Sequence, residues 1–220
     1  RYYDKLCILA FLPSIRSGGL PRKTTNKQTS GQVRIIAGQC RGRRINFPAV
    51  VGLRPTGDRL RETLFNWLTA DLKGARCLDL FAGSGALGLE AASRGAGEVI
   101  LLELNNTAAR ALGDNIDLLG LKSTTVVNTD ALNWLQQNAS DSKPFDIIFL
   151  DPPFDSTLLA DTIAALTQQS ALLAQDAMIY IEAPARQTLD FMPDSWRLHR
   201  HKTAGDVTCY LYRLHPNPDN

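Results

Sequence analysis

The chain is poor in the residues that build disulfides and metal sites. It has four cysteines and three histidines among 220 residues. The cysteines stand far apart without a C-x-x-C pair, so neither a disulfide framework nor a zinc knuckle is predicted. His199 and His201 have no cysteine or carboxylate at ligand spacing and are interpreted as surface residues. The sequence therefore predicts a reduced, cytoplasmic protein without a metal ion.

Long apolar runs are also missing. No stretch approaches the roughly 18 residues that a membrane-spanning helix needs. The apolar stretch 6–12 is short, and no small-residue cleavage site follows it, so a secretory signal is disfavoured. With 44% hydrophobic and 21% charged residues, the composition is that of a globular protein. We expect no association with a membrane.

The small net charge of +2 hides an uneven distribution. Residues 1–61 contain 13 Lys and Arg against two acidic residues, which gives +11, whereas residues 62–220 carry −9. A basic front on an acidic body favours a polyanion partner, with a merely solvated face as the alternative. Arginine predominates there, and its guanidinium suits bidentate phosphate contacts. The candidate phosphate-binding residues are Arg34, Arg41, Arg43, Arg44, Arg54, Arg59 and Arg61.

The chain is expected to form three segments. Residues 1–30 are rich in Ser, Thr, Gly, Lys and Arg and indicate a flexible basic tail. Residues 31–57 alternate apolar and basic residues around glycines, which is typical of a β-hairpin arm. Residues 58–220 form the main domain. Its first helix is predicted to open with Asp58 or Thr56 as the cap.

From Ala75 onward, strand and helix patterns alternate. Strands are predicted at 76–80, 99–103, 124–127, 145–150, 178–182, 197–202 and 208–214. Helices are predicted at 86–94, 107–119, 132–137 and 158–167, with one further helical turn before Met178. This βαβα order indicates an α/β fold with a parallel, doubly wound sheet. The last two strands are predicted to close the sheet as an antiparallel hairpin.

A glycine-rich loop follows the first strand of this series. Gly83, Gly85 and Gly88 satisfy G-x-G-x-x-G between a strand and a helix. That context is typical of nucleotide-type cofactors, because glycine lets the backbone approach the ligand. Glu103 ends the next strand, where a carboxylate can accept hydrogen bonds from ribose hydroxyls. These features predict a cofactor site that suits either a dinucleotide or S-adenosylmethionine.

Two aspartates bear on the choice between these cofactors. Asp79 stands four residues before Gly83. A carboxylate there complements the cationic amino group of S-adenosylmethionine but would oppose the pyrophosphate of a dinucleotide. The alternative for Asp79 is a carboxylate that caps the loop backbone. Asp130 follows the third strand, where it can reach an adenine amine or cap the next helix, and both roles can coexist. The sequence therefore favours S-adenosylmethionine.

A second motif ends the fourth strand. Asp151, Pro152, Pro153 and Phe154 follow the apolar stretch 145–150. Two prolines fix the backbone and remove two N–H donors. The Asp151 carboxylate and the Pro152 carbonyl are left as acceptors beside the flat ring of Phe154. Ligands in open α/β sheets bind at the carboxyl ends of strands. The motif therefore suits a planar ring that carries an NH2 group.

Several motifs together resemble known methyltransferases. Asp-Pro-Pro-Phe is similar to the (Asp/Asn)-Pro-Pro-(Tyr/Phe) motif of enzymes that methylate amino groups of nucleic-acid bases. With LDLFAGSG at 78–85, the chain resembles a class I S-adenosylmethionine-dependent methyltransferase. Residues 31–214 resemble the RsmD family of bacterial 16S ribosomal RNA (guanine-N2)-methyltransferases. The motifs that carry this likeness are GQVRIIAGQ at 31–39, RGRR at 41–44 and LRPTGDRLRETLFN at 53–66.

The resemblance implies a Rossmann-like fold with a seven-stranded, mostly parallel sheet. It also implies methylation of the N2 amine of guanine 966 in 16S rRNA, either as naked RNA or in the assembling 30S subunit. The protein is expected to act as a monomer, and the arginines named above are expected to bind RNA. The implied catalytic residues are Asp151, Pro152, Pro153 and Phe154. The implied cofactor-binding residues are Asp79, Phe81, Ala82, Gly83, Ser84, Gly85, Glu103, Leu104, Asp130, Ala131 and Asp151.

Two other functions stay open. An adenine-N6 methyltransferase acting on DNA or RNA keeps the fold and needs the same acceptor geometry, so the Asp-Pro-Pro-Phe motif does not exclude it. A non-catalytic RNA-binding factor for ribosome assembly is a different class of protein. Such a factor would not need Asp79, Glu103 and Asp151 together. Labelled product analysis separates all of these functions.

Overall fold

The computed structural model describes residues 31–48, 57–138, 143–154 and 157–215. The predicted tail at 1–30 lies outside the described residues, as do Arg54 and Thr56. None of the described helices has the length and apolar character that a membrane span requires.

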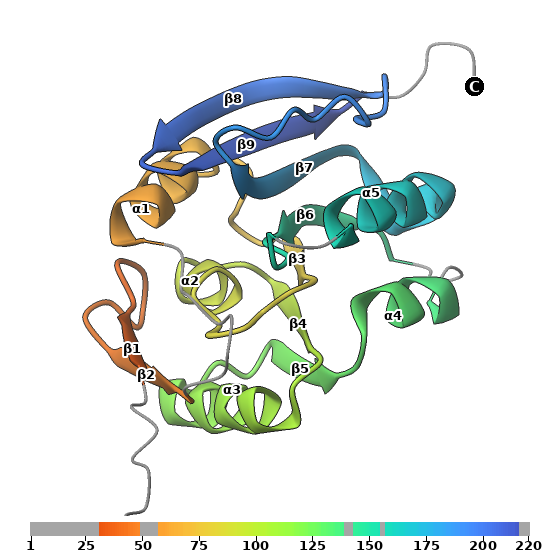
Figure 1. The fold of residues 1–220 in the computed structure, drawn as a ribbon. Coiled ribbons are helices and arrows are strands. Elements are labelled where there is room, and N and C mark those ends of the chain that lie inside the picture. Colours follow the sequence, from red (N-terminus) through yellow and green to blue (C-terminus); the bar gives the residue numbers. More distant parts are fainter. Residues whose placement is uncertain (1–30, 49–56, 139–142, 155–156, 216–220) are drawn as a thin grey trace, which may run out of the picture.

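A twisted seven-stranded sheet forms the centre of the molecule, with the order β5-β4-β3-β6-β7-β9-β8 (Figure 1). Neighbours from β5 to β7 pair in parallel, whereas β9 pairs antiparallel with both β7 and β8. This confirms the predicted α/β fold and its closing hairpin. The strands are β3 (Arg76–Asp79), β4 (Glu98–Glu103), β5 (Thr124–Asn128), β6 (Phe145–Leu150), β7 (Leu173–Pro184), β8 (Trp196–Ala204) and β9 (Val207–Leu214).

Helices cover both faces of the sheet and create two apolar cores. The alternation along β6 shows how: Ile147 and Phe149 join one core, whereas Ile148 and Leu150 join the other. The first core packs against α1, α2 and α3, and the second against α4 and α5. The helices are α1 (Asp58–Trp67), α2 (Gly88–Ser93), α3 (Asn106–Leu119), α4 (Ala131–Gln137) and α5 (Leu158–Gln168), followed by the 3-10 turn η1 (Ser170–Leu172).

The predicted hairpin arm is present and is built into the first core. β1 (Gly31–Arg34) pairs antiparallel with β2 (Arg44–Phe47), and Figure 1 shows this pair beside α2 and α3. Val33, Ile35 and Ile45 are buried there because their side chains point inward from the alternating strands. Glu90 of α2 accepts hydrogen bonds from the backbone N–H groups of Ile36 and Ala37. The arm is thus fixed by apolar packing and by a buried carboxylate.

Three local expectations differ from the structure. Gly57 is the N-cap residue of α1, and Asp58 is its first helical residue, whose carboxylate binds Arg61 instead of capping the backbone. α2 begins at Gly88, later than expected, because residues up to Leu87 still form the turns of the glycine loop. β7 begins at Leu173, earlier than expected, since its first residues alternate without an apolar run.

Candidate active site

Three acidic side chains lie at the carboxyl ends of adjacent strands. Asp79 ends β3, Asp151 follows β6, and Glu182 lies near the end of β7. The strand register brings them close together. Asp79 is paired with Phe149, two residues before Asp151, and the pair Leu150–Ile181 directly precedes Asp151 and Glu182. Because the carboxyl ends of parallel strands form the ligand-binding edge of such sheets, this row marks the candidate site.

The glycine loop is shaped by positive backbone angles and close packing. Gly83 has φ +51° and Gly85 has φ +79°, which favour glycine over residues with a side chain. A Cβ at Gly88 would stand 2.1 Å from Leu101 of β4, so glycine lets α2 pack directly on the sheet. The first two glycines therefore set the path of the loop, and the third sets the distance between helix and strand.

Glu103 is held against this loop. Its Oε2 accepts a hydrogen bond from the Gly83 N–H at 2.8 Å, and its Oε1 accepts one from Asn105 N–H at 2.7 Å. Leu104 beside it is 70% exposed, which presents an apolar surface next to the carboxylate. Asp130 caps α4 by accepting from Asn133 N–H at 2.9 Å, so the structural role foreseen for it is confirmed. Its contact with an adenine amine remains a prediction.

Asp79 is buried beneath the glycine loop. Its Oδ2 accepts a hydrogen bond from Gly88 N–H at 3.1 Å, so the alternative role of capping the loop backbone is realised. Its Oδ1 is buried without a hydrogen-bond partner in the described structure. The pKa of Asp79 is raised to about 7, mainly because the carboxyl group is buried. The backbone N–H groups of Gly88 and Phe81 lower this pKa, whereas the negative charges of Glu103 and Glu182 contribute to the rise. A cation beside Asp79 would relieve this cost.

The raised pKa of Asp79 predicts a pH-dependent stability difference. Between pH 4 and 7 the unfolded chain loses this proton while the folded protein keeps it, so stability falls as the pH rises. A rise of the pKa from its ordinary value to about 7 corresponds to roughly 4 kcal/mol. Relative to wild type, Asp79→Asn should therefore gain stability progressively from pH 4 to 7 and little above that. Urea unfolding of both proteins across this range measures the difference. A constant difference would contradict the raised pKa.

Pro152, Pro153 and Phe154 line a small hollow next to β7. Pro152 is buried, Pro153 is exposed, and the ring of Phe154 is 41% exposed. Glu182 lines the same hollow and is 4% exposed, and Tyr180 donates a hydrogen bond to its Oε1 at 2.8 Å. The sequence interpretation did not identify Glu182 as a site residue, although its position at the end of the fifth parallel strand could have signalled it.

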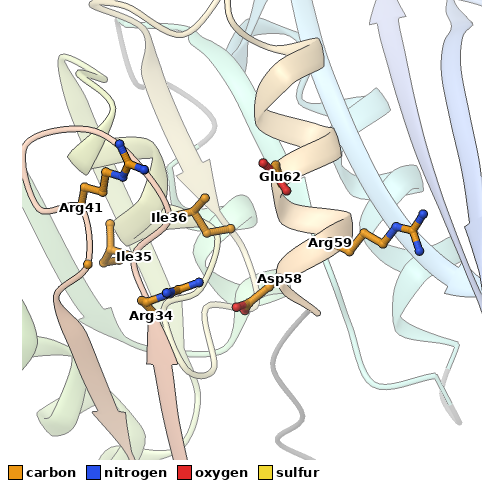
Figure 2. Close-up of a pocket in the computed structure, with 8 residues that line it drawn as sticks. Arg34, Ile35, Ile36, Arg41, Asp58, Arg59 and Glu62 are labelled. Carbon is orange, nitrogen blue, oxygen red and sulfur yellow. The ribbon is translucent and has the colours of Figure 1, made fainter.

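A larger cavity of about 420 Å³ separates the arm from α1. Figure 2 shows Arg34 and Arg41 of the arm on one side and Asp58 and Glu62 of α1 on the other, whereas Arg59 points away from the arm. The predicted arginines Arg34, Arg41, Arg43, Arg44 and Arg59 are all exposed. The arm therefore presents a basic surface, as its composition predicted.

Arg61 is a correction to the predicted basic surface. Its side chain is fully buried, 2.6 Å from Asp58 Oδ1 and 3.5 Å from Glu90 Oε2. It also donates a hydrogen bond to the Arg34 carbonyl at 3.0 Å. A buried charge that is committed to acidic partners cannot reach a phosphate. Arg61 instead links α1 to the arm and to α2.

The two neighbouring histidines lie on the surface, as predicted. His199 and His201 are exposed, and the described residues hold no cluster of His, Cys, Asp and Glu that could bind a metal ion. Trp134 and Trp196 are buried in the second core, and Trp67 packs partly buried against the first. These tryptophans thus contribute to the packing of the two cores.

Comparison with known proteins identifies the family of this chain. A family model described as Conserved hypothetical protein 95 matches residues 33–213. Ribosomal RNA small subunit methyltransferase D of Escherichia coli (strain K12) is 46% identical over 191 residues, which are 87% of this chain and 94% of that protein. A solved Escherichia coli protein described as a candidate methyltransferase has a TM-score of 0.75 at 45% identity, covering 85% of this chain and 100% of that one.

A more distant structure shows the breadth of the fold. An RNA methyltransferase from Salinibacter ruber, in complex with S-adenosyl-L-homocysteine, has a TM-score of 0.56 at 14% identity, covering 76% of this chain and 98% of that one. At that identity the likeness concerns the fold alone. The close relatives go further, because they match nearly their whole length. This chain therefore belongs to the RsmD family of methyltransferases, and its fold is that of S-adenosylmethionine-dependent enzymes.

Proposed function

We propose that this protein transfers a methyl group from S-adenosylmethionine to the N2 amine of guanine 966 in the 16S rRNA of the small ribosomal subunit. The observation that carries this proposal is the alignment of Asp79, Asp151 and Glu182 along one edge of the sheet. That edge joins a cofactor loop on one side to an acceptor motif on the other. The 46% identical relative named as an rRNA small subunit methyltransferase supports rRNA as the substrate.

The residues around the glycine loop fit the proposed cofactor. The buried Asp79 Oδ1 lacks a partner and suits a cationic amino group. Glu103 keeps acceptor capacity for ribose hydroxyls beyond the two N–H groups it already binds, since a carboxylate offers about four lone-pair sites. A dinucleotide would instead place pyrophosphate among Asp79, Glu103 and Glu182, where charge repulsion opposes it.

The acceptor motif suits the amine of a base. When bound, the cofactor supplies a sulfonium-activated methyl group. The Asp151 carboxylate and the Pro152 carbonyl accept the two N2 hydrogens, which turns the nitrogen lone pair toward the methyl carbon, and the Phe154 ring stacks on the flipped base. As the N–C bond forms, the amine becomes acidic and Asp151 accepts its proton. Asp151 thus both orients the nucleophile and takes up the proton.

Glu182 favours guanine over adenine as the target. The guanine edge next to N2 also carries the N1–H donor, whereas adenine has an unprotonated N1 acceptor beside its amine. The Glu182 carboxylate lines the hollow with Phe154 and is acceptor-only when ionised. It can therefore accept from guanine N1–H, and it would face the adenine N1 lone pair unfavourably. This chemical asymmetry disfavours the adenine-N6 alternative.

A product assay tests the proposed function directly. The protein is incubated with radiolabelled S-adenosylmethionine and either naked 16S rRNA or 30S particles, and the RNA is digested to nucleosides. We expect labelled N2-methylguanosine, and no label in RNA that carries adenine at position 966. Labelled N6-methyladenosine would identify the adenine enzyme instead. RNA binding without any label would identify a non-catalytic assembly factor.

Removal of charge from the arm should weaken RNA binding. Arg41, Arg43 and Arg44 are exposed on the arm, and each phosphate contact contributes about 0.7–0.9 to the slope of log K against log salt. We expect their triple Gln variant to lower this slope by roughly two to three, with unchanged affinity for S-adenosylhomocysteine. Equal slopes for variant and wild type would show that the arm does not dock RNA.

The working state of the protein follows from this substrate. We propose a cytoplasmic enzyme that acts as a monomer, because one chain contains the cofactor loop, the acceptor motif and the basic arm. The comparison of naked rRNA with 30S particles in the product assay identifies the form of the substrate. Sedimentation of the protein alone and with RNA tests the monomeric state.

A further inference from the structure

A second basic surface lies on the last strand of the sheet. Every residue from Arg197 to Thr203 on β8 is exposed. This stretch contains Arg197, Arg200 and Lys202, two histidines and no acidic residue. These cations are conspicuous because residues 62–220 carry a net charge of −9. We call Arg197, Arg200 and Lys202 the β8 strip.

A register shift brings the β8 strip to one face. Arg197 is paired with Arg213 and Leu198 with Tyr212, but Arg200 is paired with Leu211, so the register shifts between Leu198 and Arg200. In a regular strand Arg197 and Arg200 would point to opposite faces. With one extra residue, all three cations of the strip lie opposite residues of β9 that face the first core: Arg213, Leu211 and Cys209.

The strip begins at the catalytic edge. Lys202 is paired with Cys209, and Cys209 is paired with Glu182 of β7. Lys202 is therefore in the same row as the Glu182 carboxylate that lines the base hollow. β8 and β6 are three strand spacings apart, which is about 14 Å. An RNA strand with its target base beside Phe154 and Glu182 would pass the end of β8 within a few nucleotides.

Charged residues on an outer strand can also be explained without a ligand. Edge strands often carry charged residues because these prevent edge-to-edge aggregation. Lysine is a common choice for that purpose, so the positive sign alone does not separate the two explanations. The strip contains cations only, gathered on one face and starting at the catalytic row. Edge protection does not require the cations to gather on one face beside this row, whereas a contact with polyanionic RNA does.

We propose that the β8 strip is a second RNA-docking surface, which binds the phosphates that follow the target nucleotide across the sheet edge. The inference rests on the proposed function, and it adds a basic surface separate from the arm. The arm packs on α2 and α3, whereas β8 closes the other end of the sheet (Figure 1). The target base would then be held from two sides, with the hollow between them.

Charge reversal separates RNA docking from edge protection. Arg200→Glu with Lys202→Glu keeps two charges on the edge, so protection against aggregation is retained. The matched control is Lys73→Glu with Lys143→Glu, two exposed positions that precede β3 and β6 at the opposite edge of the sheet. Both double variants change the net charge by the same amount. Binding to a 16S rRNA fragment is measured from low to moderate salt for wild type and both variants.

We expect the strip variant to bind the RNA about tenfold more weakly at low salt, and its log K–log salt slope to fall by about 1.5 relative to the control. Turnover at saturating RNA and affinity for S-adenosylhomocysteine should stay at wild-type values. Strip and control variants with equal slopes would overturn the docking surface while leaving the proposed function intact. A wild-type protein that methylates no rRNA would overturn the proposed function itself, whatever the binding slopes show.

Discussion

Replacement of Asp151 by alanine should reduce methyl transfer by two to three orders of magnitude. The residue directly follows β6 in the row of strand ends, between the glycine loop and Glu182. Loss of a charge-assisted hydrogen bond, of lone-pair alignment and of the proton acceptor costs roughly 3–4 kcal/mol in the transition state. Single-turnover methylation at saturating RNA and cofactor measures this loss without interference from product release.

A conservative variant makes the Asp151 experiment specific. Asp151→Asn keeps one acceptor oxygen but cannot take up the proton, so its rate should lie between those of the wild type and of Asp151→Ala. Affinity for S-adenosylhomocysteine should stay within a few-fold in both variants, because the glycine loop and Glu103 remain in place. Near wild-type rates in Asp151→Ala would show that the Asp-Pro-Pro-Phe segment is only a rigid turn.

Glu182→Gln should change which base the enzyme prefers. The matched pair of substrates is RNA with guanine or with 2-aminopurine at the target position, since 2-aminopurine keeps the N2 amine but lacks the N1–H donor. The wild-type protein should methylate the guanine substrate roughly 10–100-fold more efficiently than the 2-aminopurine substrate. This ratio corresponds to a hydrogen bond to a charged acceptor, which contributes about 1.5–3 kcal/mol. In Glu182→Gln the preference should approach unity, because the amide can donate to the unprotonated N1.

This ratio distinguishes recognition from a structural role of Glu182. Tyr180 donates a hydrogen bond to Glu182, and burial, together with the charge of Glu182, raises the pKa of Tyr180 well above its usual value. Loss of this buried pair would affect both substrates equally. A uniform fall in both rates would therefore assign Glu182 to packing. Tyr180→Phe is the matched control, since it removes the hydrogen bond from Glu182 but keeps the carboxylate in the hollow.

Much of the site could be predicted because its residues sit in local motifs. Each of these motifs stands at the end of a strand that can be predicted from its apolar residues: the glycine pattern, Glu103 and Asp-Pro-Pro-Phe. The parallel topology then brings the ends of these strands together. Glu182 has no such motif. Its only sequence signal is its position near the end of the fifth predicted strand, and the pairing of β6 with β7 places it beside Asp151.

Arg61 was wrongly predicted to bind phosphate, because its burial depends on residues that are distant in the sequence. Asp58, Arg59 and Glu62 beside it are charged, but Leu64, Phe65 and Leu68 lie three, four and seven residues later and are buried. This spacing places Arg61 on the inner face of α1. Its acidic partner Glu90 is 29 positions away on another helix, and no local pattern connects the two. Long-range ion pairs of this kind depend on the packing of elements, which composition alone does not reveal.

The buried carboxylate of Glu90 has a consequence for the affinity of the arm. It holds the backbone of Ile36 and Ala37, while Arg61 holds the carbonyl of Arg34. Ordering a residue of flexible chain on binding costs about 1–2 kcal/mol in conformational entropy. Here that ordering is completed when the protein folds, so the arm would meet the proposed RNA substrate as a preorganised surface. Loosening Glu90 would lower affinity without the loss of a single positive charge.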